Sequence, residues 1–393
     1  MYQNKKDSLK KIISKKNNFK NVGWTLGNSC PFHCDHCYSK SVRQDSLYLT
    51  TKMADRIIKE LLLLNIQNVN LGGNEPIFTN GFNINLSILP YVLEKLFNNG
   101  VKVGLTTCGT SLIFLYKKWP HLLKFLNDID ISLDSPFSNE HNDSRGADLF
   151  EDAMHALKIC NLLNIERTII VCAMRWNFTI NHLKGFIRIS KKFRANLRIN
   201  SLRPVELKHL NLMPTPIQYF TGFAYLLEKS DSFDLSDPPI ATVCNFENSK
   251  CPCGLTSFRI HSINTYGEIA VSPCVYLHDY KTGNILKESL SSIVSSPPFV
   301  DFQFRSNNPE LIKECTNCLF LNICRGGCIA RSYLTTFHLK KVKTLYSQDP
   351  YCVKNELENG KILLKQFPKI NNIKSSKNLI HHNYLCTWIG RPY

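Results

Sequence analysis

Apolar residues recur in two alternating patterns between residues 21 and 203. Short apolar runs are typical of buried strands, and longer stretches with an apolar residue at every third or fourth position are typical of helices. We expect strands at residues 22–26, 68–71, 101–106, 129–133, 167–173 and 197–202. We expect helices between them at residues 52–65, 85–99, 112–126, 150–163 and 180–193. Strands that alternate with helices predict a parallel sheet with crossover helices.

Six β/α units are fewer than a closed (β/α)8 barrel contains, so the pattern predicts an open, partial (β/α)6 TIM-like barrel. In such barrels the functional groups gather at the carboxyl ends of the strands. The polar and cysteine-bearing segments of this chain follow the first four predicted strands, at residues 30–37, 72–76, 107–109 and 132–134. Their common rim predicts a functional site there.

The pattern changes after the barrel. Residues 204–243 read as a helical linker with a helix at 218–229, and residues 244–353 hold most of the cysteines among short strands and turns. This region predicts a small cysteine-rich α+β domain organised by metal. Two basic segments flank these parts, an N-terminal extension (1–20) and a C-terminal tail of unassigned role (354–393).

Composition narrows the class of protein. No run of eighteen apolar residues exists, so no membrane-spanning helix is expected, and the Lys-rich N-terminus has no apolar core of a secretion signal. A cytoplasmic location follows, and sixteen cysteines then favour metal binding over disulfides. The net charge of +17 favours an acidic partner. Nucleic acid is not expected, because aromatic and basic residues are not interleaved.

Three cysteines follow the first predicted strand with the spacing CxxxCxxC: Cys30, Cys34 and Cys37. Three thiolates on one loop can hold three corners of a [4Fe–4S] cluster and leave one iron open for a ligand that is not protein. A zinc site or a chance spacing is the alternative. Cys160 and Cys172 lie in apolar patterns and are expected in the core.

The cysteine loop, followed by a Gly-Gly-Glu-Pro-like segment after the second strand, resembles the radical S-adenosylmethionine (SAM) superfamily. The resemblance implies that Cys30, Cys34 and Cys37 hold the cluster and that its open iron binds SAM, which is cleaved to a 5′-deoxyadenosyl radical. It also implies a set of SAM-contacting residues: His36 near the adenine, Gly72, Gly73 and Glu75 near the amino group, Ser132 and Asp134 near the ribose, and Arg145 in the loop that follows. Asn74 is an extra residue in the glycine segment.

The downstream cysteines resemble the SPASM domain, which carries two auxiliary [4Fe–4S] clusters. The first cluster is then expected on Cys251, Cys253, Cys274 and Cys328, with Cys244 as the alternative to Cys251. The second is expected on Cys315, Cys318, Cys324 and Cys352. A zinc ribbon is the alternative for the Cys315 and Cys318 pair.

The resemblance implies an enzyme that abstracts hydrogen from a peptide or protein, with maturation of a ribosomally synthesised peptide as the leading hypothesis. The alternatives are a sulfatase-maturase-like oxidase that forms formylglycine, biosynthesis of a peptide-derived cofactor, and a zinc-organised binding protein. Formylglycine-type maturases have an Asp after the cysteine that matches Cys274, whereas this chain has Val275 there and Asp279 further on. No catalytic residue is assigned.

Two protein partners are expected besides the substrate. The cluster chemistry implies an electron donor such as flavodoxin or ferredoxin. About twenty residues precede the first predicted strand, so leader recognition is expected from a separate protein, or not at all.

Overall fold

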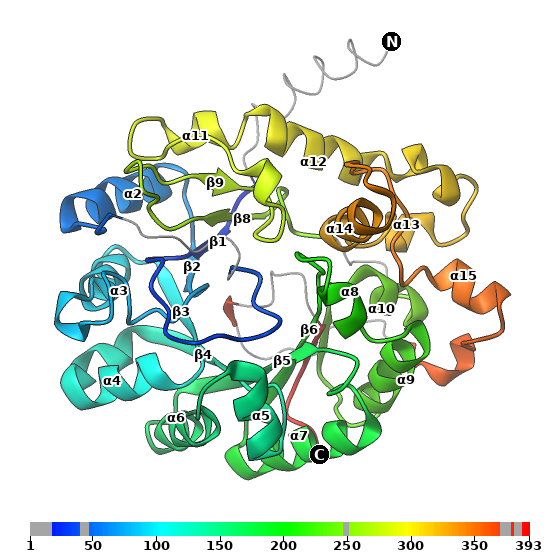
Figure 1. The fold of residues 1–393 in the computed structure, drawn as a ribbon, viewed down its shortest axis with the longest axis horizontal. Coiled ribbons are helices and arrows are strands. Elements are labelled where there is room, and N and C mark those ends of the chain that lie inside the picture. Colours follow the sequence, from blue (N-terminus) through cyan, green and yellow to red (C-terminus); the bar gives the residue numbers. More distant parts are fainter. Residues whose placement is uncertain (1–17, 40–46, 247–250, 370–378, 381–386) are drawn as a thin grey trace.

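The computed structural model describes residues 18–39, 47–246, 251–369, 379–380 and 387–393. Its described strands form one sheet with the order β7-β10-β6-β5-β4-β3-β2-β1-β8-β9. Viewed along its short axis, this sheet curves around a centre, with helices on its outside (Figure 1).

The core of this sheet consists of parallel neighbours in chain order. They are β1 (Asn21–Trp24), β2 (Asn68–Leu71), β3 (Lys102–Thr107), β4 (Leu126–Ser132), β5 (Glu166–Ala173) and β6 (Asn196–Ser201). Each pairs in parallel with the next. Their buried apolar side chains are mainly Val, Leu and Ile, as is typical of strands covered on both faces. The predicted partial barrel is confirmed.

Crossover helices cover the outer face of the barrel (Figure 1). They are α2 (Thr51–Leu63), α3 (Leu89–Asn98), α4 (Thr110–Lys118), α6 (Phe150–Leu162) and α7 (Ile180–Phe193). The helix expected at 112–126 ends early, because Pro120 cannot continue the hydrogen-bond ladder and a 3₁₀ helix, η3 (Pro120–Phe125), follows. A further helix, α5 (Ser138–Arg145), occupies a segment that was expected to be a loop.

The region after β6 contains more regular structure than one linker helix. It has α8 (His209–Leu212), α9 (Pro216–Leu227), the short strand β7 (Phe233–Leu235) and α10 (Pro238–Val243). Thr215 and Gln218 form a reciprocal cap at the start of α9, which explains why this helix begins at Pro216.

The cysteine-rich region extends the barrel sheet. Strand β8 (Ser257–Ile260) pairs in parallel with β1, and β9 (Val271–Ser272) pairs antiparallel with β8. Its helices are α11 (Leu290–Ile293), α12 (Pro297–Asn307), α13 (Leu321–Cys324), α14 (Ile329–Lys340) and α15 (Val353–Glu358). Because β8 adjoins β1, this region lies next to the strand that leads into the cysteine loop.

The C-terminal residues belong to the sheet as well. Strand β10 (Thr387–Ile389) runs antiparallel between β6 and β7. Upstream of it, Ile380 is 1% exposed and its N–H donates to the Asp128 carboxylate at 3.2 Å. A Cβ added at Gly104 would lie 3.1 Å from Ile380, so this glycine makes room for the isoleucine. Part of a tail whose role the sequence leaves unassigned thus adds a strand to the sheet and packs against β3.

None of the helices in the described ranges is long and apolar enough to cross a membrane, which agrees with the expectation from the sequence.

Candidate functional site

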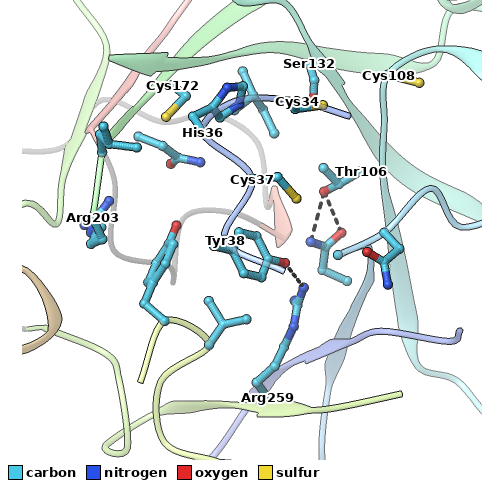
Figure 2. A pocket seen from close by; sticks show the side chains of 18 of the residues that line it. Cys34, His36, Cys37, Tyr38, Thr106, Cys108, Ser132, Cys172, Arg203 and Arg259 are labelled. Atoms are coloured by element: carbon cyan, nitrogen blue, oxygen red, sulfur yellow. Dashed lines mark hydrogen bonds between the residues drawn. The ribbon is translucent and has the colours of Figure 1, made fainter. Parts of the chain in front are cut away.

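A cavity of about 270 Å³ lies at the carboxyl ends of the barrel strands. Its walls come from the rim of β1 to β6 and from the cysteine-rich region, including Cys253 and Cys274. Figure 2 shows part of this lining, with Cys34 and Cys37 of the cysteine loop and Arg259 of β8 labelled. Cys30, Cys34 and Cys37 line it together, which places the CxxxCxxC loop at the site predicted from the strand order.

The end of helix α5 holds the cysteine loop by its backbone. The N–H of His33 donates to the carbonyl of Arg145 at 3.2 Å, and the N–H of Asp35 donates to that of Ser144 at 3.1 Å. Gly146 ends the helix with φ +62°, and a Cβ there would lie 3.2 Å from His33. Glycine at this position therefore allows both the turn and the close approach of the loop.

Arg145 also reaches the middle cysteine. Its Nη1 lies 3.8 Å from Cys34 Sγ, and its Nε lies 2.6 Å from Asp134 Oδ2. Burial raises the pKa of the Cys34 thiol, and the guanidinium opposes that rise. Burial would also raise the pKa of Asp134, but Arg145 and His36 outweigh it and the pKa lies below its ordinary value. Asp134 is therefore ionised, and the cation that it holds favours the thiolate, which is the form that binds iron.

Glu75 fixes the glycine segment to the next strand. Its carboxylate accepts hydrogen bonds from the N–H of Cys108 at 3.0 Å, from the N–H of Ser111 at 2.8 Å, and from the hydroxyls of Ser111 and Thr107. Gly73 has φ +123°, and a Cβ there would lie 2.3 Å from Thr25 Oγ1. The segment after β2 is thus pinned to the start of α4, with Gly73 on the cavity wall.

The extra residue Asn74 joins two loops. Its side chain accepts a hydrogen bond from Ser39 Oγ at 2.8 Å and donates to the carbonyl of Gly27 at 2.8 Å. Ser39 Oγ in turn lies 3.3 Å from Cys37 Sγ. The insertion therefore connects the glycine segment to the cysteine loop instead of disrupting it.

The structure brings most of the expected SAM-contacting residues to one cavity. Those that line it are His36, Gly73, Glu75, Ser132, Asp134 and Arg145. Gly72 is outside the lining set and its carbonyl accepts from Arg259 at 3.2 Å. The His36 side chain is 11% exposed and lies 3.6 Å from Asp134, and its buried Nδ1 has no hydrogen-bond partner among the described residues. A buried, unsatisfied ring nitrogen on the wall fits a ligand that hydrogen-bonds there.

Two cysteines of the first downstream group, Cys253 and Cys274, line the same cavity. The thiol of Cys253 interacts with those of both Cys251 and Cys274, and Cys328 lies within electrostatic reach of Cys251. Cys244 is apart from them. It is packed in the hydrophobic core, and burial alone raises the pKa of its thiol to about 12. Of the two alternatives, the geometry places Cys251 with the group.

The second group is farther from the cavity. Cys352 is within electrostatic reach of Cys315, Cys318 and Cys324. Burial raises the pKa of Cys315 to about 11 and that of Cys324 to about 12.

The donors of these candidate sites are all cysteine sulfurs. Cysteine sulfurs in sets of three or four are the usual ligands of iron–sulfur clusters. In the described part of the chain, no three Cys, His, Asp or Glu side chains converge on one point as a single metal ion requires. The donor sets, which are all sulfur, fit iron–sulfur clusters.

Comparison with known proteins identifies both parts of the chain. Residues 24–187 match the family model of the radical SAM superfamily, and residues 251–319 match that of SPASM, an iron–sulfur cluster-binding domain. The chain is a radical SAM enzyme with a SPASM domain. Such domains bind [4Fe–4S] clusters and SAM, so the expected cofactors are confirmed.

Curated relatives include mycofactocin maturases. The chain is 26% identical over 346 residues to mycofactocin maturase MftC of Mycolicibacterium smegmatis, which covers 84% of this chain and 81% of that protein. It is 24% identical over 360 residues to MftC of Mycobacterium tuberculosis H37Rv, covering 88% and 86% of the two chains.

Solved structures share the fold of this radical SAM chain. Streptococcus suis SuiB bound to its precursor peptide SuiA superposes with a TM-score of 0.61 at 16% identity, covering 89% of this chain and 79% of that chain. The structure of anSMEcpe with bound AdoMet gives a TM-score of 0.64 at 16% identity, covering 88% and 97%.

Several cavity residues were not expected from the sequence. Cys172 was assigned to the core, yet it lines the cavity, where burial raises the pKa of its thiol to about 12. Arg259 donates a hydrogen bond to the Tyr38 hydroxyl at 2.9 Å, and both residues line the cavity (Figure 2). Arg203 lies 5.2 Å above the ring of Tyr276. Tyr38 directly follows Cys37 and Arg203 closely follows β6, which could have indicated them, whereas Arg259 lies within β8 and carries no such signal.

Asp279 does not reach the cavity. It is ion-paired with Lys343 at 2.8 Å and accepts a hydrogen bond from Tyr333 at 2.9 Å. Val275, directly after Cys274, lines the wall instead. Among the described residues, Glu75 and Asp134 are the carboxylates of the cavity, and both are engaged by other groups.

Proposed function

We propose that this chain matures a ribosomally synthesised peptide by abstracting a hydrogen atom from it. The observation that carries the proposal is the single cavity whose walls include both the CxxxCxxC loop and two cysteines of the SPASM region. The similarity to MftC, a maturase, and the shared fold with SuiB, which has been solved with a precursor peptide, support a peptide as the substrate. A modified peptide and a cofactor built from a peptide both fit this proposal.

We assign the cysteines to three clusters. Cys30, Cys34 and Cys37 hold the one that binds SAM. Cys251, Cys253, Cys274 and Cys328 hold the first auxiliary cluster, and Cys315, Cys318, Cys324 and Cys352 hold the second. When bound, the first of these supplies the electron that cleaves SAM to a 5′-deoxyadenosyl radical.

The protein's own groups prepare the cavity for that reaction. Arg145 lies against Cys34 and favours its thiolate form. Glu75 and Asn74 hold the glycine segment beside the cysteine loop, where the amino group of SAM binds. The barrel rim and the SPASM region enclose the space, which keeps water and competing hydrogen donors from a radical. His36, Gly72, Gly73, Ser132 and Asp134 complete the proposed SAM site.

The remaining parts of the proposal concern organisation and partners. We divide the chain into an N-terminal extension (1–20), a barrel (21–203), a linker (204–243), a SPASM domain (244–353) and a tail (354–393). The substrate peptide is acidic, in keeping with the charge of +17. A flavodoxin or ferredoxin delivers electrons, and the enzyme acts in the cytoplasm.

The arrangement of carboxylates counts against formylglycine formation. The position after Cys274 is Val275, and Asp279 is occupied by Lys343 outside the cavity. An oxidase of that type needs a carboxylate base beside the substrate, and neither residue provides it.

Anaerobic reconstitution tests the proposal. We expect about twelve iron atoms per chain and reductive cleavage of SAM to 5′-deoxyadenosine. Cys30→Ala should abolish the cleavage, while the matched core variant Cys160→Ala should retain it, because Cys160 is buried away from the cavity. Stoichiometric zinc without SAM cleavage, or 5′-deoxyadenosine formation by Cys30→Ala, would refute the assignment.

A further inference from the structure

Three completely buried arginines surround the turn that carries Cys328: Arg203, Arg305 and Arg331. A buried guanidinium costs several kcal/mol unless an opposite charge compensates it. Arg331 is compensated, since it is ion-paired with Asp237 at 3.1 Å and with Asp349 at 2.8 Å. Within the described ranges the other two form no ion pair, although Arg203 lies within electrostatic reach of Asp237.

Arg305 is the clearest case, because all its hydrogen bonds go to backbone carbonyls. It donates to Arg325 O at 2.6 Å, to Gly326 O at 2.8 Å and to Leu345 O at 3.3 Å. No carboxylate of the described residues lies within ion-pair distance of it. These neutral acceptors satisfy its N–H groups but leave its positive charge unbalanced.

The groups that face this charge are cysteines of both auxiliary sets. Arg305 is within electrostatic reach of Cys251 and Cys328 of the first set and of Cys315 and Cys324 of the second. Burial lowers the pKa of Arg305 and these cysteines oppose the decrease. As cluster ligands they are thiolates, so two anionic clusters would supply the missing compensation.

The turn that Arg305 holds is also the covalent link between the two sets. Arg325 and Gly326 lie between Cys324, assigned to the second cluster, and Cys328, assigned to the first. Gly326 has φ +75°, and a Cβ there would lie 2.9 Å from Arg305 Nη2, so glycine lets the guanidinium approach. At the far end, the N–H of Cys328 donates to Asp349 at 2.7 Å. The turn is fixed from both sides.

We propose that Arg305 is a shared counter-cation of the two auxiliary clusters, which raises both of their reduction potentials and fixes the turn between them. The inference rests on the proposed ligand sets. One-electron reduction adds a negative charge to a cluster, and a nearby buried cation stabilises that reduced form. Arg305 is thus a positioning residue for electron transfer and does not touch the substrate.

Redox titration of the full chain tests this, with the reduced clusters followed by electron paramagnetic resonance. A background with Cys30, Cys34 and Cys37 replaced by Ala removes the SAM-binding cluster and leaves the auxiliary signals. In this background Arg305→Gln should make both auxiliary potentials more negative by about 59 mV or more, which is a tenfold change in a one-electron equilibrium. Arg305→Lys, which keeps the charge, should stay close to the parent.

Arg167 provides the matched control. It is buried, and its guanidinium also donates to backbone carbonyls, those of Phe193 at 2.7 Å and Ile165 at 2.8 Å, but it lies in the barrel strand β5 among no proposed ligands. Arg167→Gln should therefore leave both potentials unchanged even if it lowers stability.

Each outcome decides the inference. Loaded clusters with unchanged potentials in Arg305→Gln, or a shift in one cluster alone, would overturn it. Arg305→Gln could instead fail to take up auxiliary iron. In that case, iron binding by Arg305→Lys would show that the clusters need the positive charge and would support the inference. Loss of iron in Arg305→Lys as well would show that only the shape and packing of the guanidinium group matter, and would overturn it. Failure of the parent protein to bind iron would count against the proposed function instead.

Discussion

Cys251 and Cys244 both precede Cys253 in the sequence, but their surroundings differ. Cys251 interacts with the thiol of Cys253, whereas Cys244 is enclosed by apolar side chains. A cluster ligand must be a thiolate, and a purely apolar environment opposes that form. The fourth ligand, which spacing alone left open, is therefore better placed at Cys251.

Iron content distinguishes the two cysteines. Cys251→Ala should lose the first auxiliary cluster, about four iron atoms per chain, because a cubane needs its fourth thiolate or a substitute. Cys244→Ala should keep a full complement of iron. Colorimetric iron assays and the electron paramagnetic resonance signals of the reduced proteins give the answer. The reverse pattern would assign the ligand to Cys244.

At the residue scale, the spacing of residues along the sequence predicted the site residues that lie on one loop. It did not predict contacts in the site between segments that are far apart in the sequence. The CxxxCxxC loop and Glu75 were identified because each directly follows a predicted strand. The guanidinium carbon of Arg203 lies 5.2 Å from the centre of the Tyr276 ring. This contact forms only when the SPASM region packs against the barrel. No local pattern in the sequence encodes such a contact between segments far apart in the chain.

At the scale of elements, helix α5 shows that a helix made of polar residues cannot be recognised from apolar periodicity. Its residues 138–145 are almost entirely polar, so no apolar periodicity marks them as a helix. The helix nevertheless ends with Arg145 and Gly146 against the cysteine loop. Similarly, β7 and β10 are only three residues long, too short for a pattern to distinguish them from a turn.

The segment around Ile380 should contribute to the stability of the barrel. Ile380→Ala removes a buried side chain that packs on Gly104, and such truncations cost about 2–5 kcal/mol. Leu363→Ala in the same tail is the matched control, since Leu363 is 48% exposed and should change stability by about 0.5 kcal/mol at most. Urea unfolding midpoints measured without oxygen compare the two. Equal unfolding midpoints for the two variants would show that the Ile380 side chain does not stabilise the barrel.

For the molecule as a whole, the SPASM region and the barrel are less separate than the change in composition indicated. Strand β8 pairs directly with β1, so the sheet is continuous from one region to the other. This continuity brings Cys253 and Cys274 to the cavity, and no boundary drawn from composition could have shown it.

Global stability should fall in mild acid because of His141. Its Nδ1 accepts the N–H of Asp134 at 3.0 Å, and burial, with Arg145, lowers the pKa of His141 from 6.5 to about 4. The unfolded chain therefore takes up this proton first, and the free energy of unfolding decreases as the pH falls below 6.5. Between pH 7 and pH 5 the loss from this group is about 2 kcal/mol.

His141→Asn tests that dependence, because Asn keeps an acceptor and does not titrate. Its unfolding midpoint in urea should change less between pH 7 and pH 5 than that of the parent protein. The same change in both proteins would show that other groups cause the acid sensitivity. The lowered pKa of Asp134 does not affect this comparison. The stability that an ionised aspartate contributes is lost only at a pH below the range measured here.

The position of β10 has a consequence for how the enzyme is made. Strand β6 lacks its outer neighbour until residues 387–389 have left the ribosome, because β10 lies between β6 and β7. A nascent chain thus carries an open sheet edge, which is a site for unwanted pairing. The sheet is therefore completed only after residues 387–389 have been synthesised and have paired with β6. A chaperone that covers the nascent chain would protect this edge until then.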